Sequence, residues 1–245
     1  MRLLGLHIVC VIALFSGIAK ATAQTASPPP APSPKKANER PVQPHSNTAE
    51  PFDDAPIEKM SAQCVRLETE AGTIELEMLA EAAPESVRNF LNLAATGAFD
   101  TTTFSRVVKD FVVQGGNLAT RTPPISNALA ERMHRTIPDE PSYVKHMRGI
   151  VSMARTDTPH SATTNFFILV SDAPHLDGTF SAVGRIVAGM DVVDAINHAP
   201  IEGEKPLKPV RLLRATVVRC TKPTVMPTAE PLKEPERKPE KPALR

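Results

Sequence analysis

The segment 103–117 contains the most unusual residue pattern of the chain. In it, Arg106 lies among apolar residues typical of a strand. A guanidinium carries a fixed fork of N–H donors, and burying it without acceptors costs free energy. Arg106 therefore either pairs with an internal acceptor as a structural arginine or offers its donors to a bound ligand. Taken alone, the pattern favours the structural interpretation.

Signatures of other catalytic chemistries are missing from the sequence. There is no GxSxG nucleophile motif, Ser152 lies in an apolar run, and no cysteine accompanies a histidine in a known pattern. The histidines between residues 59 and 220 show no HExxH or HxH spacing, and neither GxGxxG nor GxxxxGK[ST] occurs. We therefore expect no metal site and no cofactor.

Short strands and two helices are expected to position this stretch. Apolar and charged residues alternate over 65–69 and 74–78, on either side of a turn, which predicts a β-hairpin. Helical spacing predicts helices over 84–96 and 189–198, the first bounded by Pro84 and Gly97. Strands are predicted from short apolar runs at 111–114, 149–153, 166–170, 183–187 and 212–218. So many short strands with only two helices predict a mainly β domain with a closed or strongly curved antiparallel sheet.

Proline is concentrated near the two ends of the chain, which has 245 residues and 25 prolines. Residues 25–58 contain nine of them and residues 221–245 contain six. Because proline lacks an N–H and fixes φ, such segments fit poorly into helices and strands. We predict a disordered proline-rich linker over 24–58, one folded domain over 59–220, and a disordered tail rich in proline, lysine and glutamate over 221–245. A docking segment for a proline-binding partner is the alternative for both flanks.

The net charge of +1 gives no basic surplus, so we expect no nucleic-acid partner.

Residues 1–23 have the pattern of a secretory signal peptide. Arg2 precedes an apolar run from Leu3 to Ile18, and small residues allow cleavage after Ala21 or Ala23. We expect an exported, periplasmic protein without a membrane span after cleavage. An uncleaved N-terminal anchor is the alternative, although the run falls short of the roughly 20 apolar residues that span a bilayer.

Cleavage would leave two cysteines, Cys64 and Cys220, near the two ends of the predicted domain. In an exported protein such a pair is a candidate disulfide. Two unpaired thiols remain the alternative, because a sequence does not give the Cα separation that a disulfide requires.

Three sequence blocks in a fixed order resemble the cyclophilin-type peptidyl-prolyl isomerases, most closely their exported bacterial members. The blocks are FSRVVKDFVVQGGN from Phe104, GIVSMART from Gly149 leading into TNFFIL from Thr164, and HLDGTFSAVGRI from His175. The resemblance covers about Cys64 to Cys220. It implies a closed eight-stranded antiparallel barrel capped by two helices, the cyclophilin-like form of the mainly β fold.

The resemblance also implies roles for individual residues. It identifies Arg106 as the catalytic arginine, acting with Phe111 and Gln114. Further positions of the substrate groove would be Val112, Met153, Ala154, Asn165, Phe167, Leu176 and Phe180. Departures from the family's common residues occur at Ser105, Asn165, His175 and Phe180, which implies an altered sequence preference and puts tight cyclosporin binding in doubt.

The function that the resemblance implies is a rotamase, a peptidyl-prolyl cis-trans isomerase that assists the folding of exported proteins. Its partners would be proline-containing polypeptides, and we expect it to act as a monomer. The alternative is a non-catalytic module that binds proline-containing peptides, or a holdase chaperone of the cell envelope.

Overall fold

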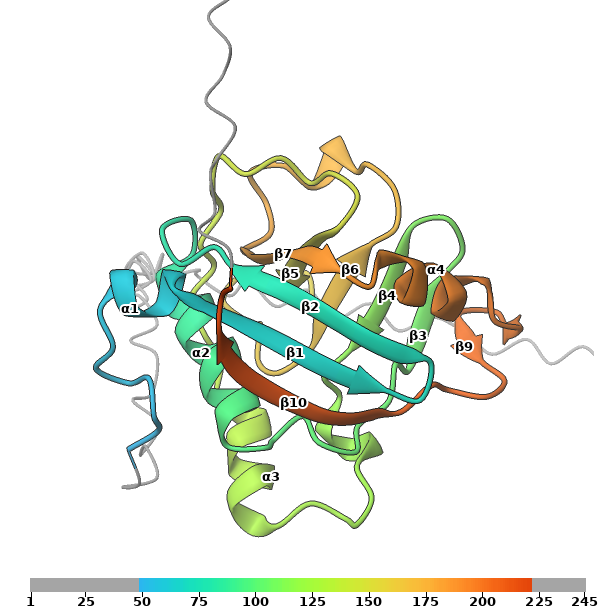
Figure 1. Ribbon diagram of the computed structural model, residues 1–245, viewed down its shortest axis with the longest axis horizontal. Helices are drawn as coiled ribbons and strands as arrows, with labels where there is room; N and C mark the ends of the chain where they lie inside the picture. The colour runs from blue at the N-terminus through green and yellow to red at the C-terminus, as the bar shows by residue number, and fades with distance from the viewer. Residues whose placement is uncertain (1–48, 222–245) are drawn as a thin grey trace, which may run out of the picture. The chain divides into compact units, whose positions relative to one another are not determined.

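A curled antiparallel sheet of eight strands forms the centre of the computed structural model, which describes residues 49–221 (Figure 1). The strand order is β10-β1-β2-β7-β5-β6-β4-β3. The predicted signal peptide, most of the predicted linker and nearly all of the predicted tail lie outside the described residues. Within the described residues, no helix is long and apolar enough to cross a membrane.

Seven strands of the main sheet follow the predicted apolar runs closely, whereas β3 and the short strands β8 and β9 were not predicted. Strands β1 and β2 pair as the predicted hairpin, with Leu67 opposite Ile74. The strands of the main sheet are β1 (Gln63–Thr69), β2 (Gly72–Met78), β3 (Arg106–Val108), β4 (Val112–Gly115), β5 (Ile150–Met153), β6 (Phe166–Leu169), β7 (Ala182–Ala188) and β10 (Leu212–Arg219). A separate two-stranded hairpin consists of β8 (Ile201–Glu202) and β9 (Lys205–Pro206).

The sheet is a half-barrel, so the expected closure by strand pairing does not occur. Strands β3 and β10 are the two edges of the sheet. An isolated β-bridge joins Thr103, just before β3, to Arg211, just before β10. The reason lies in β3, which is three residues long and is preceded by a turn in which Thr101 has a positive φ of 62°. The outer edge of β3 instead receives the β8–β9 hairpin, since the amide of Val107 donates to the carbonyl of Glu204 at 2.8 Å.

Both predicted helices are present, and the described residues 49–221 contain two more. Helix α2 (Pro84–Ala95) and helix α4 (Met190–His198) lie toward opposite ends of the strands (Figure 1). The additional helices are α1 (Ile57–Ser61) and α3 (Asn127–His134), and short 3-10 turns span η1 (Leu118–Thr120) and η2 (Pro174–Leu176). Neither α1 nor α3 was predicted, because a helical period needs several turns to be recognised and these helices have only five and eight residues.

The folded region begins before residue 59, the predicted boundary. Phe52 is buried in the main core, and the carboxylate of Glu50 accepts a hydrogen bond from the side chain of Arg132 at 2.8 Å. Arg135 pairs with the same carboxylate. The first described residues are thus tied to α3 and to Arg135 just after it, at the start of segment 128–148, which leads from α3 to β5.

Segment 128–148 also caps α2. The residue before this helix, Ala83, has no side chain that could accept from the free amides of the first turn. The carboxylate of Glu140 takes this role, accepting from the amides of Glu85 at 3.0 Å and Ser86 at 2.7 Å. Its negative charge also faces the positive end of the helix dipole.

Replacing Glu140 with alanine should therefore lower the free energy of unfolding by about 1 kcal/mol, the usual cost of a lost helix cap. Urea denaturation would measure it. Glu131→Ala, which removes the same charge from an exposed position on α3, is the matched control. Equal stability of the two variants would contradict the capping role.

Alternation along the strands divides the apolar residues between two faces. Phe166 is fully buried in the main core, edge-on to Phe90 at 5.2 Å and to Phe99 at 5.4 Å between ring centroids. Its neighbour Phe167 points to the opposite face, where it joins a second, smaller cluster with Val112. Most of the functional candidates lie on this second face.

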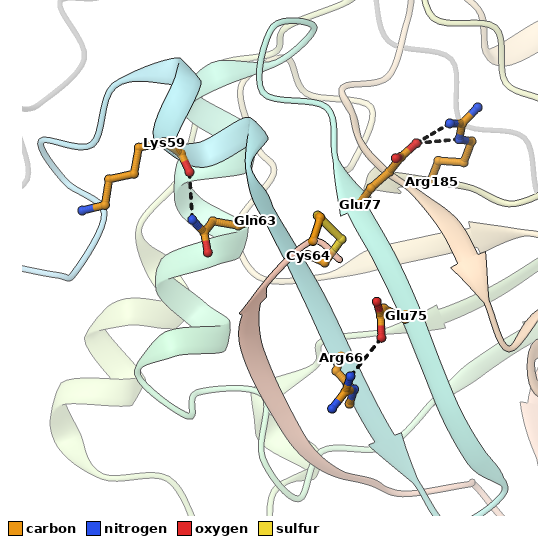
Figure 2. Close-up of a disulfide and its surroundings, with 8 residues drawn as sticks. Lys59, Gln63, Cys64, Arg66, Glu75, Glu77 and Arg185 are labelled. Atoms are coloured by element: carbon orange, nitrogen blue, oxygen red, sulfur yellow. Dashed lines mark hydrogen bonds and ion pairs between the residues drawn. A yellow bond between two sulfur atoms is a disulfide. The ribbon is translucent and has the colours of Figure 1, made fainter. Parts of the chain in front are cut away.

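A disulfide joins Cys64 on β1 to Cys220, one residue beyond β10, and their Cα atoms are 5.0 Å apart (Figure 2). Strands β1 and β10 are neighbours in the sheet, which brings the two cysteines together. Figure 2 also shows that Arg66 pairs with Glu75 across β1 and β2 at 3.2 Å.

Candidate functional site

Three residues of the predicted site stand side by side across three strands. Arg106 on β3 is directly opposite Gln114 on β4, and Gln114 is directly opposite Phe167 on β6. Because residues in register on neighbouring strands point to the same face, these side chains form one row. Their chain neighbours Val107 and Val113 point the other way and are fully buried in the main core.

A pocket of about 140 Å³ opens on this row. It is smaller than the roughly 300–1,000 Å³ of sites for drug-sized ligands, and so suits a single side chain. Its lining residues are Arg106, Phe111, Val112, Gln114, Ala154, Arg155, Phe167, Leu176 and Phe180. The structure therefore gathers eight of the ten residues that the sequence assigned to catalysis and substrate binding.

The other two predicted residues, Met153 and Asn165, do not line this pocket. Met153 is 1% exposed and belongs to the main core, because it alternates with Ala154 along the chain. Asn165 contributes its carbonyl, which accepts from the amide of Ala154 at 2.9 Å and so fixes the pocket wall.

The guanidinium of Arg106 is held by a carboxylate at the edge of the pocket. Its Nε donates to Oε2 of Glu204 at 2.7 Å and its Nη2 donates to Oε1 of the same residue at 3.1 Å. Its Nη1 donates to Oε1 of Gln114 at 3.3 Å. The hydrogen bonds from Arg106 to Glu204 and the positive charge of Arg106 lower the pKa of Glu204 below its usual value. Arg106 thus has a carboxylate partner and also lines the pocket, which combines the two interpretations that the sequence had left open.

Arg155, which the sequence did not single out, also lines the pocket, from two residues beyond the end of β5. Its guanidinium carbon lies 5.0 Å from the ring centroid of Phe180, and its Nε lies 3.7 Å from a carboxylate oxygen of Asp139. The signal was available, since Arg155 follows Ala154 directly within the second sequence block. Its partner Asp139 comes from segment 128–148, whose course the sequence did not predict.

A buried histidine, His146, anchors the residue that directly follows Leu176. His146 lies between Asp177, 3.3 Å from its Nδ1, and Ser152, 3.1 Å from its Nε2. Burial lowers the pKa of His146, and the hydrogen bond from the His146 amide lowers the pKa of Asp177. Although these are the residue types of a hydrolase triad, Ser152 is fully buried and cannot reach a substrate. The trio therefore holds the pocket wall in place.

The ring of His175, which lies next to Leu176 in η2, is 5.6 Å from the ring of Phe111 between centroids. Among residues 49–221, no group of three or more His, Cys, Asp or Glu side chains is placed to hold a metal ion.

Known proteins of one family resemble this chain over the residues that line the pocket. The model of the family described as cyclophilin type peptidyl-prolyl cis-trans isomerase/CLD matches residues 64–217. The peptidyl-prolyl cis-trans isomerase cypE of Dictyostelium discoideum is 34% identical over 161 residues, which cover 64% of this chain and 99% of that protein. Peptidyl-prolyl cis-trans isomerase A of the bacterium Dickeya dadantii is 33% identical over 171 residues, covering 63% of this chain and 84% of that protein.

A solved structure agrees with these relatives. The cyclophilin type peptidyl-prolyl cis-trans isomerase of Cryptosporidium parvum, determined in the presence of the dipeptide Ala-Pro, superposes with a TM-score of 0.56 at 26% identity. The superposition covers 64% of this chain and 99% of that one. Since the matched span includes every residue that lines the pocket, fold, pocket and relatives agree that the chain belongs to the cyclophilin-type peptidyl-prolyl cis-trans isomerase family.

Proposed function

We propose that this chain isomerises X-Pro bonds of exported polypeptides, with Arg106 as the group that stabilises the twisted amide. The observation that carries the proposal is the row of Arg106, Gln114 and Phe167 at one small pocket, which sets a fixed donor beside an apolar wall. An assay of cis-to-trans conversion of a proline peptide tests the activity, and the Arg106→Ala variant tests the mechanism.

The chemistry requires no bond to be broken. Amide resonance gives the peptide bond a rotation barrier of about 18–20 kcal/mol, and uncatalysed X-Pro isomerisation takes roughly tens to hundreds of seconds. Twisting removes the conjugation of the prolyl nitrogen and makes that atom a better acceptor. An N–H of Arg106 that donates to it therefore interacts more strongly with the transition state than with the ground state, and so lowers the barrier.

The apolar part of the pocket would hold the proline ring while the chain on its other side rotates. Phe111, Phe167 and Leu176 supply this wall, and Gln114 and the backbone near Asn165 would anchor the peptide. The Ala-Pro dipeptide named with the Cryptosporidium parvum structure supports proline-containing peptides as the substrate class.

Shortening the pocket wall should weaken substrate binding. We expect Leu176→Ala to raise KM for a proline peptide about tenfold, equivalent to roughly 1.4 kcal/mol, because one apolar contact to the ring is lost. Steady-state kinetics would measure it. Leu213→Ala is the matched control, since Leu213 lies on β10, is exposed and does not line the pocket. An unchanged KM in Leu176→Ala would remove this residue from the proposed site.

Export is proposed on the composition of residues 1–23 and is supported by the disulfide. Disulfides persist in oxidising compartments such as the periplasm and are rare in the cytosol. We propose a periplasmic, monomeric folding helper whose proline-rich segments 24–58 and 221–245 act as linkers. Cell fractionation with mass spectrometry of the N-terminus tests this. A new N-terminus after Ala21 or Ala23 supports cleavage, and an intact Met1 would instead indicate the uncleaved anchor.

One observation favours a second candidate, a binding module without useful catalysis. Glu204 occupies one edge of the Arg106 guanidinium, which a substrate would otherwise meet. Of the five N–H donors of an arginine side chain, however, the three bonds to Glu204 and Gln114 use three. The other two remain available to a substrate, so catalysis is the stronger candidate. Tight binding of a proline peptide without acceleration of its isomerisation would reverse this ranking.

A further inference from the structure

We infer that Glu204 is a positioning residue for the isomerase reaction, which holds the guanidinium of Arg106 in the orientation that the twisted amide requires. The inference rests on the proposed catalytic role of Arg106. Glu204 lies 98 residues beyond Arg106 in the sequence, between β8 and β9, and is not among the residues that line the pocket.

The contact has the geometry that best fixes an arginine. Two roughly parallel N–H···O bonds of 2.7 and 3.1 Å join the Nε–Nη2 edge of the guanidinium to both carboxylate oxygens of Glu204. Such a bidentate pair constrains the plane of the guanidinium as well as its distance. Gln114 holds the adjacent Nη1 corner at 3.3 Å, so the plane has two fixed points.

Stability alone gives little reason for this pair. The side chains of Arg106 and Glu204 are 42% and 56% exposed, and ion pairs this exposed contribute little to the stability of a fold. The pair nevertheless involves the one arginine that borders the pocket from β3. Loss of the pair is therefore expected to change the rate of isomerisation more than the stability of the fold.

The backbone of Glu204 is itself anchored on the strand that carries Arg106. The carbonyl of Glu204 accepts from the amide of Val107, the residue directly after Arg106, at 2.8 Å. Nearby, Nζ of Lys109 donates to the carbonyl of Asn197 at 2.8 Å, and Nδ2 of Asn197 donates to the carbonyl of Val108 at 2.9 Å. The end of α4 and the hairpin that follows are thus fastened to β3, which delivers the carboxylate at a fixed place.

This arrangement predicts an effect on kcat more than on KM. A donor that is already oriented stabilises the transition state without a reorganisation cost at the moment of reaction. Ground-state binding would depend mainly on the apolar wall and on Gln114, neither of which needs Glu204. Loss of the carboxylate should therefore leave the peptide bound but the donor misplaced.

The experiment compares Glu204→Ala and Glu204→Gln with the unchanged protein, using NMR exchange measurements on a proline peptide. We expect Glu204→Ala to lower kcat about 3- to 10-fold with KM within twofold of the original value. Glu204→Gln, which keeps one acceptor oxygen, should lose less. Glu202→Gln is the matched control, because it removes a charge from an exposed position on the same hairpin, and it should leave kcat unchanged.

The same substitution in the Arg106→Ala background separates this inference from the proposed function. If Glu204 acts through Arg106, Glu204→Ala should have no further effect there, and the Nε–H resonance of Arg106 should broaden in the Glu204→Ala single variant. An unchanged or increased kcat in that single variant, or an equal loss in both backgrounds, would overturn the inference. Full activity of Arg106→Ala would instead contradict the catalytic role of the arginine itself.

Discussion

Replacing Arg106 with alanine should lower kcat/KM for an X-Pro peptide by about 100-fold or more. Removal of one fixed donor to a developing charge costs roughly 100- to 1,000-fold in other enzymes, and Arg106 supplies the charged donor of the row with Gln114 and Phe167. Each tenfold loss corresponds to about 1.4 kcal/mol of transition-state stabilisation. A coupled protease assay or NMR exchange on the same peptide would measure the loss.

The expected loss is specific to the position of Arg106 at the pocket. Arg66→Ala is the matched control, because the Arg66 side chain is 45% exposed, compared with 42% for Arg106, and also pairs with a glutamate across the sheet. Both variants should keep the circular dichroism spectrum and the unfolding temperature of the unchanged protein. Arg106→Lys should restore little activity, since a lysine keeps the charge but lacks the planar fork. Activity in Arg106→Ala equal to that of Arg66→Ala would rule out the proposed mechanism.

Local periodicity explains why most of the fold was predictable. The hairpin of β1 and β2 follows from strict alternation, and α2 follows from helical spacing between Pro84 and Gly97. Alternation also separates Phe166 from Phe167, and so determines which face carries the pocket. The roles of individual residues came from the family resemblance, because the periodicity of a sequence indicates helices and strands but not which residues are catalytic.

Long-range pairings account for what the sequence did not reveal. The partner of Arg106 is Glu204, on a hairpin whose strands have two residues each, too short to give a pattern. The same hairpin occupies the outer edge of β3. Strand β3 therefore does not pair with β10, and the expected barrel is not closed. Likewise, nothing in the local sequence around Phe52 or Glu50 signals that these residues pack on the domain, because their partners lie far away in α2 and α3.

The disulfide carries the largest expected effect on stability. Replacing both Cys64 and Cys220 with serine should lower the free energy of unfolding by about 2–5 kcal/mol, because the bond closes a loop between residues 156 apart and restricts the unfolded chain. For a domain of this size, that loss corresponds to a fall of roughly 5–15 °C in Tm. Urea denaturation and calorimetry on the oxidised protein and the double variant would measure it.

Reduction provides the control, and it connects stability with the compartment. Dithiothreitol should lower the Tm of the unchanged protein to that of the double variant and should leave the double variant unaffected. The isomerase activity of both at 25 °C should be equal, since the bond joins the ends of β1 and β10 while the pocket lies on β3, β4 and β6. If the double variant were as stable as the unchanged protein, the disulfide would no longer support the proposal that the protein is exported. If the loss is as large as expected, the domain reaches its full stability only where thiols are oxidised, which is the condition of the periplasm and the opposite of that of the cytosol.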